Sequence, residues 1–224
     1  MIKSTVLFSF LILCLTLNAQ VLKEVEYNNT LYQVEEVKEK DYKDEVKTYY
    51  KVKNTESTEV SELKLEKDQS YSSIKVEWIE PAFVFVGFDP KDNSYYKIDR
   101  VFVNDKGKLF RSETDYIYEK TDSLDLTTYK AQFPRGRNAL NYWIRDNIYD
   151  ILTDYGESSQ INIVLNFTID ETGKVKDGEV LGEISEYKKT KILDKINNKM
   201  PNWIPASEKG KKVSGKYRLP INLR

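Results

Sequence analysis

The C-terminal stretch from Met200 to Arg224 constrains the fold of this chain more than any other. Pro201 and Pro205 flank Trp203, and each proline holds its own φ at about −65° and biases the residue before it toward an extended conformation. We therefore expect Trp203 to be held rigidly against a core. After a polar turn from Ser207 to Lys212, apolar residues return at alternate positions, which is the period of a half-buried strand: Val213, Tyr217, Leu219, Ile221 and Leu223.

A proline inside this strand predicts where the strand lies in its sheet. Pro220 has no N–H to donate to a ladder, so a strand that contains it belongs at a sheet edge or at a bulge. The chain is thus predicted to end in a strand with one open side. Such a side presents unpaired main-chain N–H and C=O groups, to which a further strand can add.

The first residues predict export. Lys3 precedes an uncharged run whose apolar part is about a dozen residues long, shorter than the roughly 20 residues that a membrane span needs. A secretory signal peptide has a small residue directly before its cleavage site, and Ala19 is such a residue directly before Gln20. We expect residues 1–19 to be a signal peptide. Lipidation at Cys14 is disfavoured, because Leu13 stands where a small residue is needed.

Composition narrows the chemistry. Residues 20–224 contain neither cysteine nor histidine, which excludes disulfides, thiol nucleophiles, imidazole bases and the ordinary zinc sites. No signature of a carboxylate-pair hydrolase or a Ser/Lys nucleophile is recognisable, so we expect no enzyme, no catalytic residue, no metal and no small-molecule cofactor. The nearly neutral charge gives no reason to expect a nucleic-acid partner.

The charge is divided unevenly along the chain. Residues 21–130 hold 18 Lys and Arg residues against 24 Asp and Glu residues, whereas residues 131–224 hold 16 against 12. This division predicts two domains, each long enough to bury a modest core. We place a mainly β domain of unknown family at 20–120, a linker rich in Asp, Ser and Thr at 121–132, and a second domain at 133–224.

The first domain is predicted to be an antiparallel β meander. Short apolar or alternating runs are separated by turn residues such as Asn28-Asn29 and the segment 104–107. The stretch Glu35–Asp44 suits either a frayed helix or a solvated loop. Strands are expected at 23–27, 31–37, 48–53, 60–65, 73–79, 82–87, 95–103 and 109–118.

The second domain is predicted to have the order α-β-β-α-β. Apolar spacing of three and four residues indicates an amphipathic helix over 137–152 that includes Trp143. Perfect alternation predicts a strand over 161–169, followed by a hairpin turn at 170–173 and a strand over 175–180. Ser185 can cap a second helix, whose apolar stripe is Tyr187, Ile192, Ile196 and Met200. The fold class is therefore α+β.

Five short motifs in this order resemble the C-terminal domain of TonB, in the form found in exported proteins of Bacteroidetes-type bacteria. The resemblance covers residues 133–224. Its motifs are Phe133-Pro134-x-Gly136, Phe167-x-Ile169-Asp170-x-x-Gly173-x-Val175, Met200-Pro201-x-Trp203-x-Pro205, Gly210-Lys-x-Val213 and Leu219-Pro220-Ile221-Asn222.

The resemblance implies a three-stranded antiparallel sheet with two helices, and a role in grasping the N-terminal segment of an outer-membrane receptor as an added strand. Two positions depart from the pattern, because Arg135 stands where the family has a second glycine and Asp150 where it has a proline. The structural anchors are then Phe133, Pro134, Gly136, Trp143, Phe167, Gly173, Pro201, Trp203 and Pro205.

We interpret the protein as a periplasmic interaction module, with association to the outer membrane as a further option. Its partner would be a TonB-dependent receptor or a similar envelope protein, in transport or envelope signalling. The alternative is a structural protein whose edge strand is closed by homodimerisation or by its own β domain. The residues expected to bind the peptide are Lys216, Tyr217, Arg218, Leu219, Ile221 and Asn222.

Overall fold

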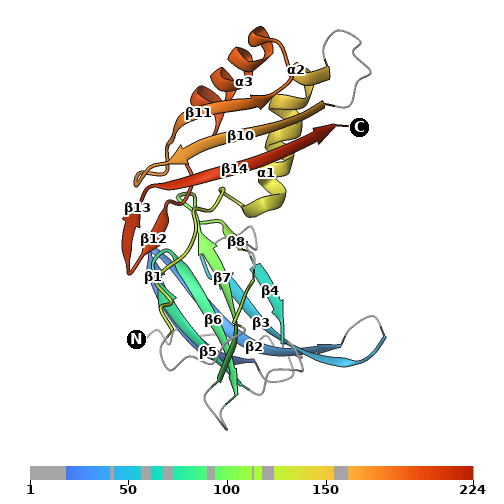
Figure 1. Ribbon diagram of the computed structural model, residues 1–224. Coiled ribbons are helices and arrows are strands. Elements are labelled where there is room, and N and C mark those ends of the chain that lie inside the picture. The colour runs from blue at the N-terminus through green and yellow to red at the C-terminus, as the bar shows by residue number, and fades with distance from the viewer. Residues whose placement is uncertain are drawn as a thin grey trace, which may run out of the picture.

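The computed structural model has an α+β fold with antiparallel sheets, as expected (Figure 1). It describes residues 19–40, 43–56, 62–67, 73–89, 94–112, 114–117, 124–153 and 161–223. The predicted signal peptide lies outside the described residues, except for its last residue. No helix in the described part of the chain is both long and apolar enough to cross a membrane.

The N-terminal half consists of two packed sheets. The first has the order β1 (Gln20–Tyr27), β2 (Thr30–Lys40), β3 (Val46–Asn54) and β4 (Glu62–Glu66). The second has the order β5 (Ser73–Ile79), β6 (Ala82–Asp89), β7 (Ser94–Val103) and β8 (Leu109–Arg111), and β9 (Asp115–Tyr116) also pairs with β7. Large side chains from both sheets form the core between them, including Tyr32, Tyr50, Phe83 and Phe85.

The stretch Glu35–Asp44 is neither a helix nor a loop over its first part, because β2 continues to Lys40. Glu35 and Glu39 lie on the outer face of the first sheet, where lysines of β3 and β4 pair with them. Lys53 lies 2.5 Å from Glu35, and Lys64 lies 2.8 Å from Glu39. Cross-strand ion pairs let a strand with this charge density form.

The second sheet is covered on both faces, which explains the continuous apolar run of β6. Phe83 and Phe85 face the first sheet, whereas Val84 and Val86 belong to a cluster on the opposite face. The segment Leu124–Gln132, within the predicted linker, packs over that opposite face. Leu124, Leu126 and Tyr129 contact the sheet there.

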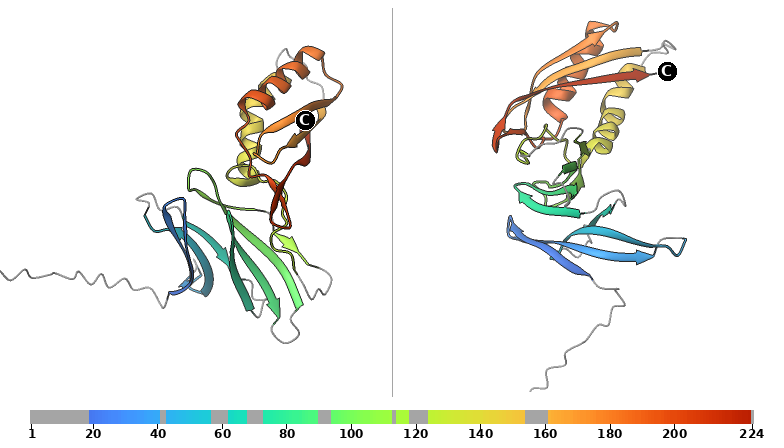
Figure 2. Two further views of the ribbon diagram at one scale, coloured as in Figure 1. Left: turned by 90° about the vertical axis from the view of Figure 1, so that its left-hand side faces the viewer. Right: turned by 60° about the horizontal axis from the view of Figure 1, so that its bottom comes forward.

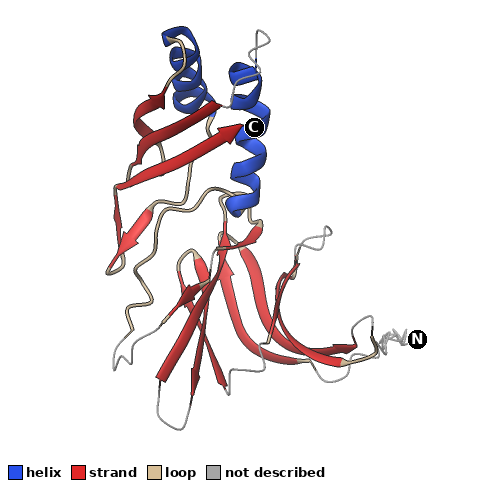
Figure 3. Cartoon of the chain, turned by 45° about the vertical axis from the view of Figure 1, so that its right-hand side comes forward, coloured by secondary structure: helices blue, strands red, loops and turns tan. Residues whose placement is uncertain are grey.

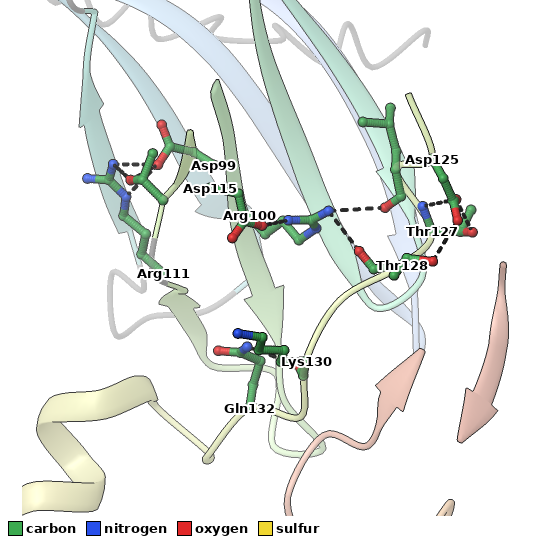
Figure 4. A network of polar contacts seen from close by, with 11 residues as sticks. Asp99, Arg100, Arg111, Asp115, Asp125, Thr127, Thr128, Lys130 and Gln132 are labelled. Carbon is green, nitrogen blue, oxygen red and sulfur yellow. Dashed lines mark hydrogen bonds and ion pairs between the residues drawn. The ribbon is translucent and has the colours of Figure 1, made fainter. Parts of the chain in front are cut away.

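Polar contacts hold this covering segment, which we call the strap, in place (Figure 4). Arg100 of β7 is buried, pairs with Asp115 at 2.6 Å and donates to the main-chain carbonyl of Thr128 at 3.1 Å. Asp125 accepts hydrogen bonds from the hydroxyls of Thr127 and Thr128. These bonds, that from Thr127 most of all, lower the pKa of its carboxyl to about 2. The strap, which is the described part of the predicted linker, is therefore a fixed part of the fold.

The strap also pairs with the C-terminal half through two bridges. Tyr129 exchanges main-chain hydrogen bonds with Ser207, and Gln132 exchanges them with Ile204, all at 2.9 Å. Ile204 packs beside Tyr129 on the second sheet. The two halves of the chain are thus joined by main-chain pairing as well as by apolar contact.

The first helix of the C-terminal half runs through α1 (Gly136–Ile144), the π-helix η1 (Arg145–Tyr149) and α2 (Asp150–Thr153). Its buried residues recur every four positions, at Leu140, Ile144, Ile148 and Leu152. A regular α-helix of about 3.6 residues per turn would rotate this series off one face. The wider turn of the π-helix corrects the rotation and keeps all of them on the core.

The second helix, α3 (Glu186–Lys199), begins where the sequence predicted. The Ser185 side chain accepts a hydrogen bond from the Lys188 N–H at 3.3 Å. The predicted stripe needs a correction, because Tyr187 is exposed and Lys188 is buried instead. The Lys188 Nζ donates to the carbonyl of Leu152 at 3.1 Å, at the end of α2, where a cation is favourable.

The C-terminal sheet has the order β11 (Val175–Gly182), β10 (Ile161–Ile169) and β14 (Gly215–Leu223). The helices lie on one face of this sheet and leave the other face open (Figures 2 and 3). The predicted polar turn at 207–212 is a hairpin, formed by β12 (Ala206–Glu208) and β13 (Lys211–Val213). Lys209 and Gly210 make its turn with positive φ.

Candidate functional site: the open edge of the C-terminal sheet

The terminal strand β14 lies at the edge of its sheet, as Pro220 predicted. It runs antiparallel to β10 over its full length, from Gly215 opposite Ile169 to Leu223 opposite Ile161, without a register shift. Among the described residues, β10 is the only strand that pairs with β14. The opposite side of β14 is therefore an open edge in the part of the chain that the structure describes (Figure 1).

The register identifies which main-chain groups the open edge presents. Asp170, directly after β10, donates its N–H to the carbonyl of Lys174 on the β11 side. Because successive residues of a strand point their main-chain groups to opposite edges, the odd-numbered residues of β10 face β14. Their partners face β10 in turn: Gly215, Tyr217, Leu219, Ile221 and Leu223. The residues that face outward are Lys216, Arg218, Pro220 and Asn222.

The missing N–H of Pro220 therefore lies on the open side, where it costs no ladder hydrogen bond. Lys216, Arg218 and Asn222 offer both a donor and an acceptor there. The predicted binding residues thus divide into two sets. Tyr217, Leu219 and Ile221 use their main-chain groups to hold β14 in the sheet. The outward set can be identified from the sequence, because Pro220 must face outward and residues two positions apart in a strand face the same edge.

The side chains of β14 separate in the same way. Tyr217, Leu219 and Ile221 turn toward the helices and pack on the C-terminal core, where Ile221 is buried and the other two are half-buried. Lys216, Arg218 and Asn222 are exposed on the helix-free face. The open edge is thus flanked by an apolar face, which the helices cover, and by a polar face, which is free of helices.

Neither basic side chain of this edge is paired with an acidic group of the described residues. Three acidic groups of the neighbouring hairpin have other partners: Asp170 pairs with Lys176 at 2.8 Å, Glu171 accepts from Ser214 at 2.9 Å, and Glu179 accepts from Asn166 at 3.1 Å. On the outer face of the first sheet, by contrast, Lys51 lies 3.4 Å from both Glu39 and Glu62. Unpaired positive charge is thus a feature of the open edge.

An aromatic cluster supports the edge strand from beneath. Trp203 is 3% exposed and packs edge-on against Phe133, Phe167 and Tyr217, with ring centroids 5.3, 5.8 and 4.7 Å away. Phe167 and Tyr217 also stack on each other. Trp203, Phe133 and Phe167 are all buried in the C-terminal core. The cluster also ties β14 to the segment Pro201–Pro205.

Gly173 lets the hairpin turn touch Trp203. Its φ is +85°, and its carbonyl accepts a hydrogen bond from the Trp203 N–H at 2.8 Å. A Cβ at this position would lie 2.0 Å from the main-chain oxygen of Trp203. Only glycine fits both the left-handed conformation and this close approach.

The carboxylate of Asp170 organises the same turn. It accepts hydrogen bonds from Lys176, from the Thr172 hydroxyl and from the main-chain N–H groups of Thr172 and Lys174. The bond from Lys176 and that from the Thr172 hydroxyl hold the pKa of Asp170 well below its usual range. Asp177 lies nearby at the β11 bulge and has a φ of 53°. Both residues serve turn geometry.

The remaining predicted anchors differ in burial. Pro205 and Gly136 are buried, and Gly136 has a φ of +80°. Pro134 and Trp143 are half-buried, whereas Pro201 is exposed. A Cβ on Gly136 would lie 3.1 Å from the carbonyl oxygen of Arg111, so this glycine allows α1 to approach the N-terminal sheet.

Comparisons of the chain with protein-family models, with curated proteins and with solved structures found no match.

Proposed function

We propose that the protein is an interaction module that captures an extended peptide by strand addition at the open edge of β14. The observation that carries this proposal is the outward direction of the main-chain groups of Lys216, Arg218 and Asn222, which no described strand pairs. An added strand satisfies these groups and gains affinity from main-chain hydrogen bonds. The activity is binding rather than catalysis.

We propose further that the C-terminal half is a TonB C-terminal-like domain. Its support is the order of helix, β10, β11, α3 and β14, together with the five sequence motifs. The peptide would then be the N-terminal segment of an outer-membrane receptor or a similar envelope protein, met in the periplasm after export. The predicted signal peptide supports that location.

Self-association at the same edge is a second candidate. In an antiparallel pair of two β14 strands centred on Leu219, Lys216 lies opposite Asn222 and Arg218 lies opposite Pro220. No like charges face each other in this register, so charge does not prevent it. The molecular mass in solution distinguishes the candidates, because a tight dimer of this kind leaves no free edge.

Replacing Arg218 by proline is expected to weaken capture of a receptor N-terminal peptide by about tenfold, which corresponds to one lost hydrogen bond of about 1.4 kcal/mol. The change removes an outward N–H and leaves the pairing with β10 intact. Isothermal titration calorimetry with the full chain measures the effect.

The matched control is Arg218→Ala, which removes the side chain and keeps the N–H. The unfolding midpoint in urea should be similar for both variants. If the proline variant binds the peptide as tightly as the alanine variant, strand addition at this edge is wrong.

A further inference from the structure

We infer that the open edge selects extended peptides in which acidic and apolar residues alternate. This inference rests on the proposed strand addition and specifies the side chains of the added strand. It follows from the two different faces that flank the edge, because directly opposed residues of neighbouring strands point their side chains to the same face.

The acidic positions follow from the helix-free face. A peptide residue opposite Lys216 or Arg218 places its side chain beside that basic group. Both groups are exposed, and neither is paired with an acidic residue of the described chain. On the same face, Thr168 of β10 lies opposite Lys216, and Asn166 lies opposite Arg218. A carboxylate at either peptide position therefore meets a cation and neutral polar neighbours.

The apolar positions follow from the helix-covered face. Peptide residues between the acidic ones lie beside Tyr217 and Leu219, which are half-buried and pack on the core. Ala139 and Trp143 of α1 pack on the same core and are also half-buried. An apolar peptide side chain extends this partly covered surface, whereas a charged one loses solvent without gaining a partner.

The part of the open edge that can pair with a peptide without interruption also contains the basic residues. Pro220 interrupts the row of outward donors, so the continuous part of the edge runs from Gly215 to Leu219. This part contains Lys216 and Arg218. Main-chain affinity and charge preference therefore act on the same short segment of the peptide, and an acidic-apolar repeat of about two residue pairs is enough to use both.

The test compares three nine-residue probes with valine at alternate positions and glutamate, glutamine or lysine between them. Binding to the purified full chain is measured by fluorescence anisotropy in dilute salt. We expect the glutamate probe to bind at least about tenfold more tightly than the lysine probe, because two opposite-charge pairs replace two like-charge pairs. The preference should shrink in about 1 M salt, where screening is strong.

Charge reversal provides the decisive comparison. The double variant K216E/R218E should reverse the preference and favour the lysine probe. The control K191E/K199E makes the same change in net charge at exposed residues of α3. This helix packs against β11, the strand at the opposite edge of the sheet from β14. This control should keep the preference of the unmodified chain.

The outcomes separate the two claims. If all three probes bind equally and Arg218→Pro weakens each of them, strand addition stands and the charge preference is wrong. If K191E/K199E changes the preference as much as K216E/R218E does, the selectivity comes from net charge and the inference is overturned. If no probe binds, both the inference and the proposed function are overturned.

Discussion

Replacing Trp203 by alanine is expected to lower the free energy of unfolding by about 3–5 kcal/mol, the usual cost of removing a buried tryptophan. Trp203 is almost fully buried and contacts Phe133, Phe167 and Tyr217, so its loss leaves a cavity beneath the edge strand. Urea unfolding of the two proteins at equilibrium measures the difference.

The control for this substitution is Trp143→Ala. From sequence, both tryptophans are expected to be core anchors of similar weight, but the structure buries Trp143 only in part. We therefore expect a clearly smaller loss for Trp143→Ala. Equal losses in the two variants would show that the aromatic cluster around Trp203 is not the centre of the C-terminal core.

Replacing Gly173 by alanine is expected to cost about 3 kcal/mol or more, although it adds a single methyl group. Backbone strain at positive φ and the clash with the Trp203 carbonyl each contribute about 1–3 kcal/mol. Because the clashing atom belongs to the main chain, no side-chain rotation relieves it. The Trp203 N–H should also lose its acceptor, which amide hydrogen exchange at that residue reports.

The control Gly210→Ala separates the cost of backbone strain at positive φ from the cost of a steric clash. Gly210 has a φ of +75°, close to that of Gly173, but an added Cβ would lie 3.9 Å from Thr127, in ordinary contact. Its expected cost is about 1 kcal/mol, from strain alone. If the two glycine variants lose the same stability, the contact between the hairpin turn and Trp203 does not hold the edge in place.

The sequence predicts those structural elements that depend only on residues close to one another in the chain. The alternation over residues 161–169 corresponds to the bounds of β10, and Ser185 caps α3 because its side chain reaches an N–H three residues away. The two asparagines at 28 and 29 both have positive φ and form the hairpin turn that their sequence indicated. The position of β14 at a sheet edge followed from the chemistry of Pro220.

Features that depend on distant contacts cannot be predicted from local patterns. The sequence predicts a linker where the structure has the strap, because nothing within this segment indicates that Arg100 of β7 is buried beneath it and donates to its carbonyls. The sequence likewise predicts only a polar turn at the hairpin of β12 and β13, since the pairing of Ser207 with Tyr129 is not visible locally. The close approach of Gly173 to Trp203 is likewise a tertiary contact.

The central claim, that the open edge of β14 captures an extended segment of another protein, is tested most directly by photo-crosslinking in living cells. A photoreactive residue is placed at Lys216 or Asn222, which flank the outward edge, and at Lys199 of α3 as a control. The account predicts that mass spectrometry finds links from the edge positions to the N-terminal segments of outer-membrane proteins, and none from the control. Links only to the protein's own chain or to a second copy would contradict it.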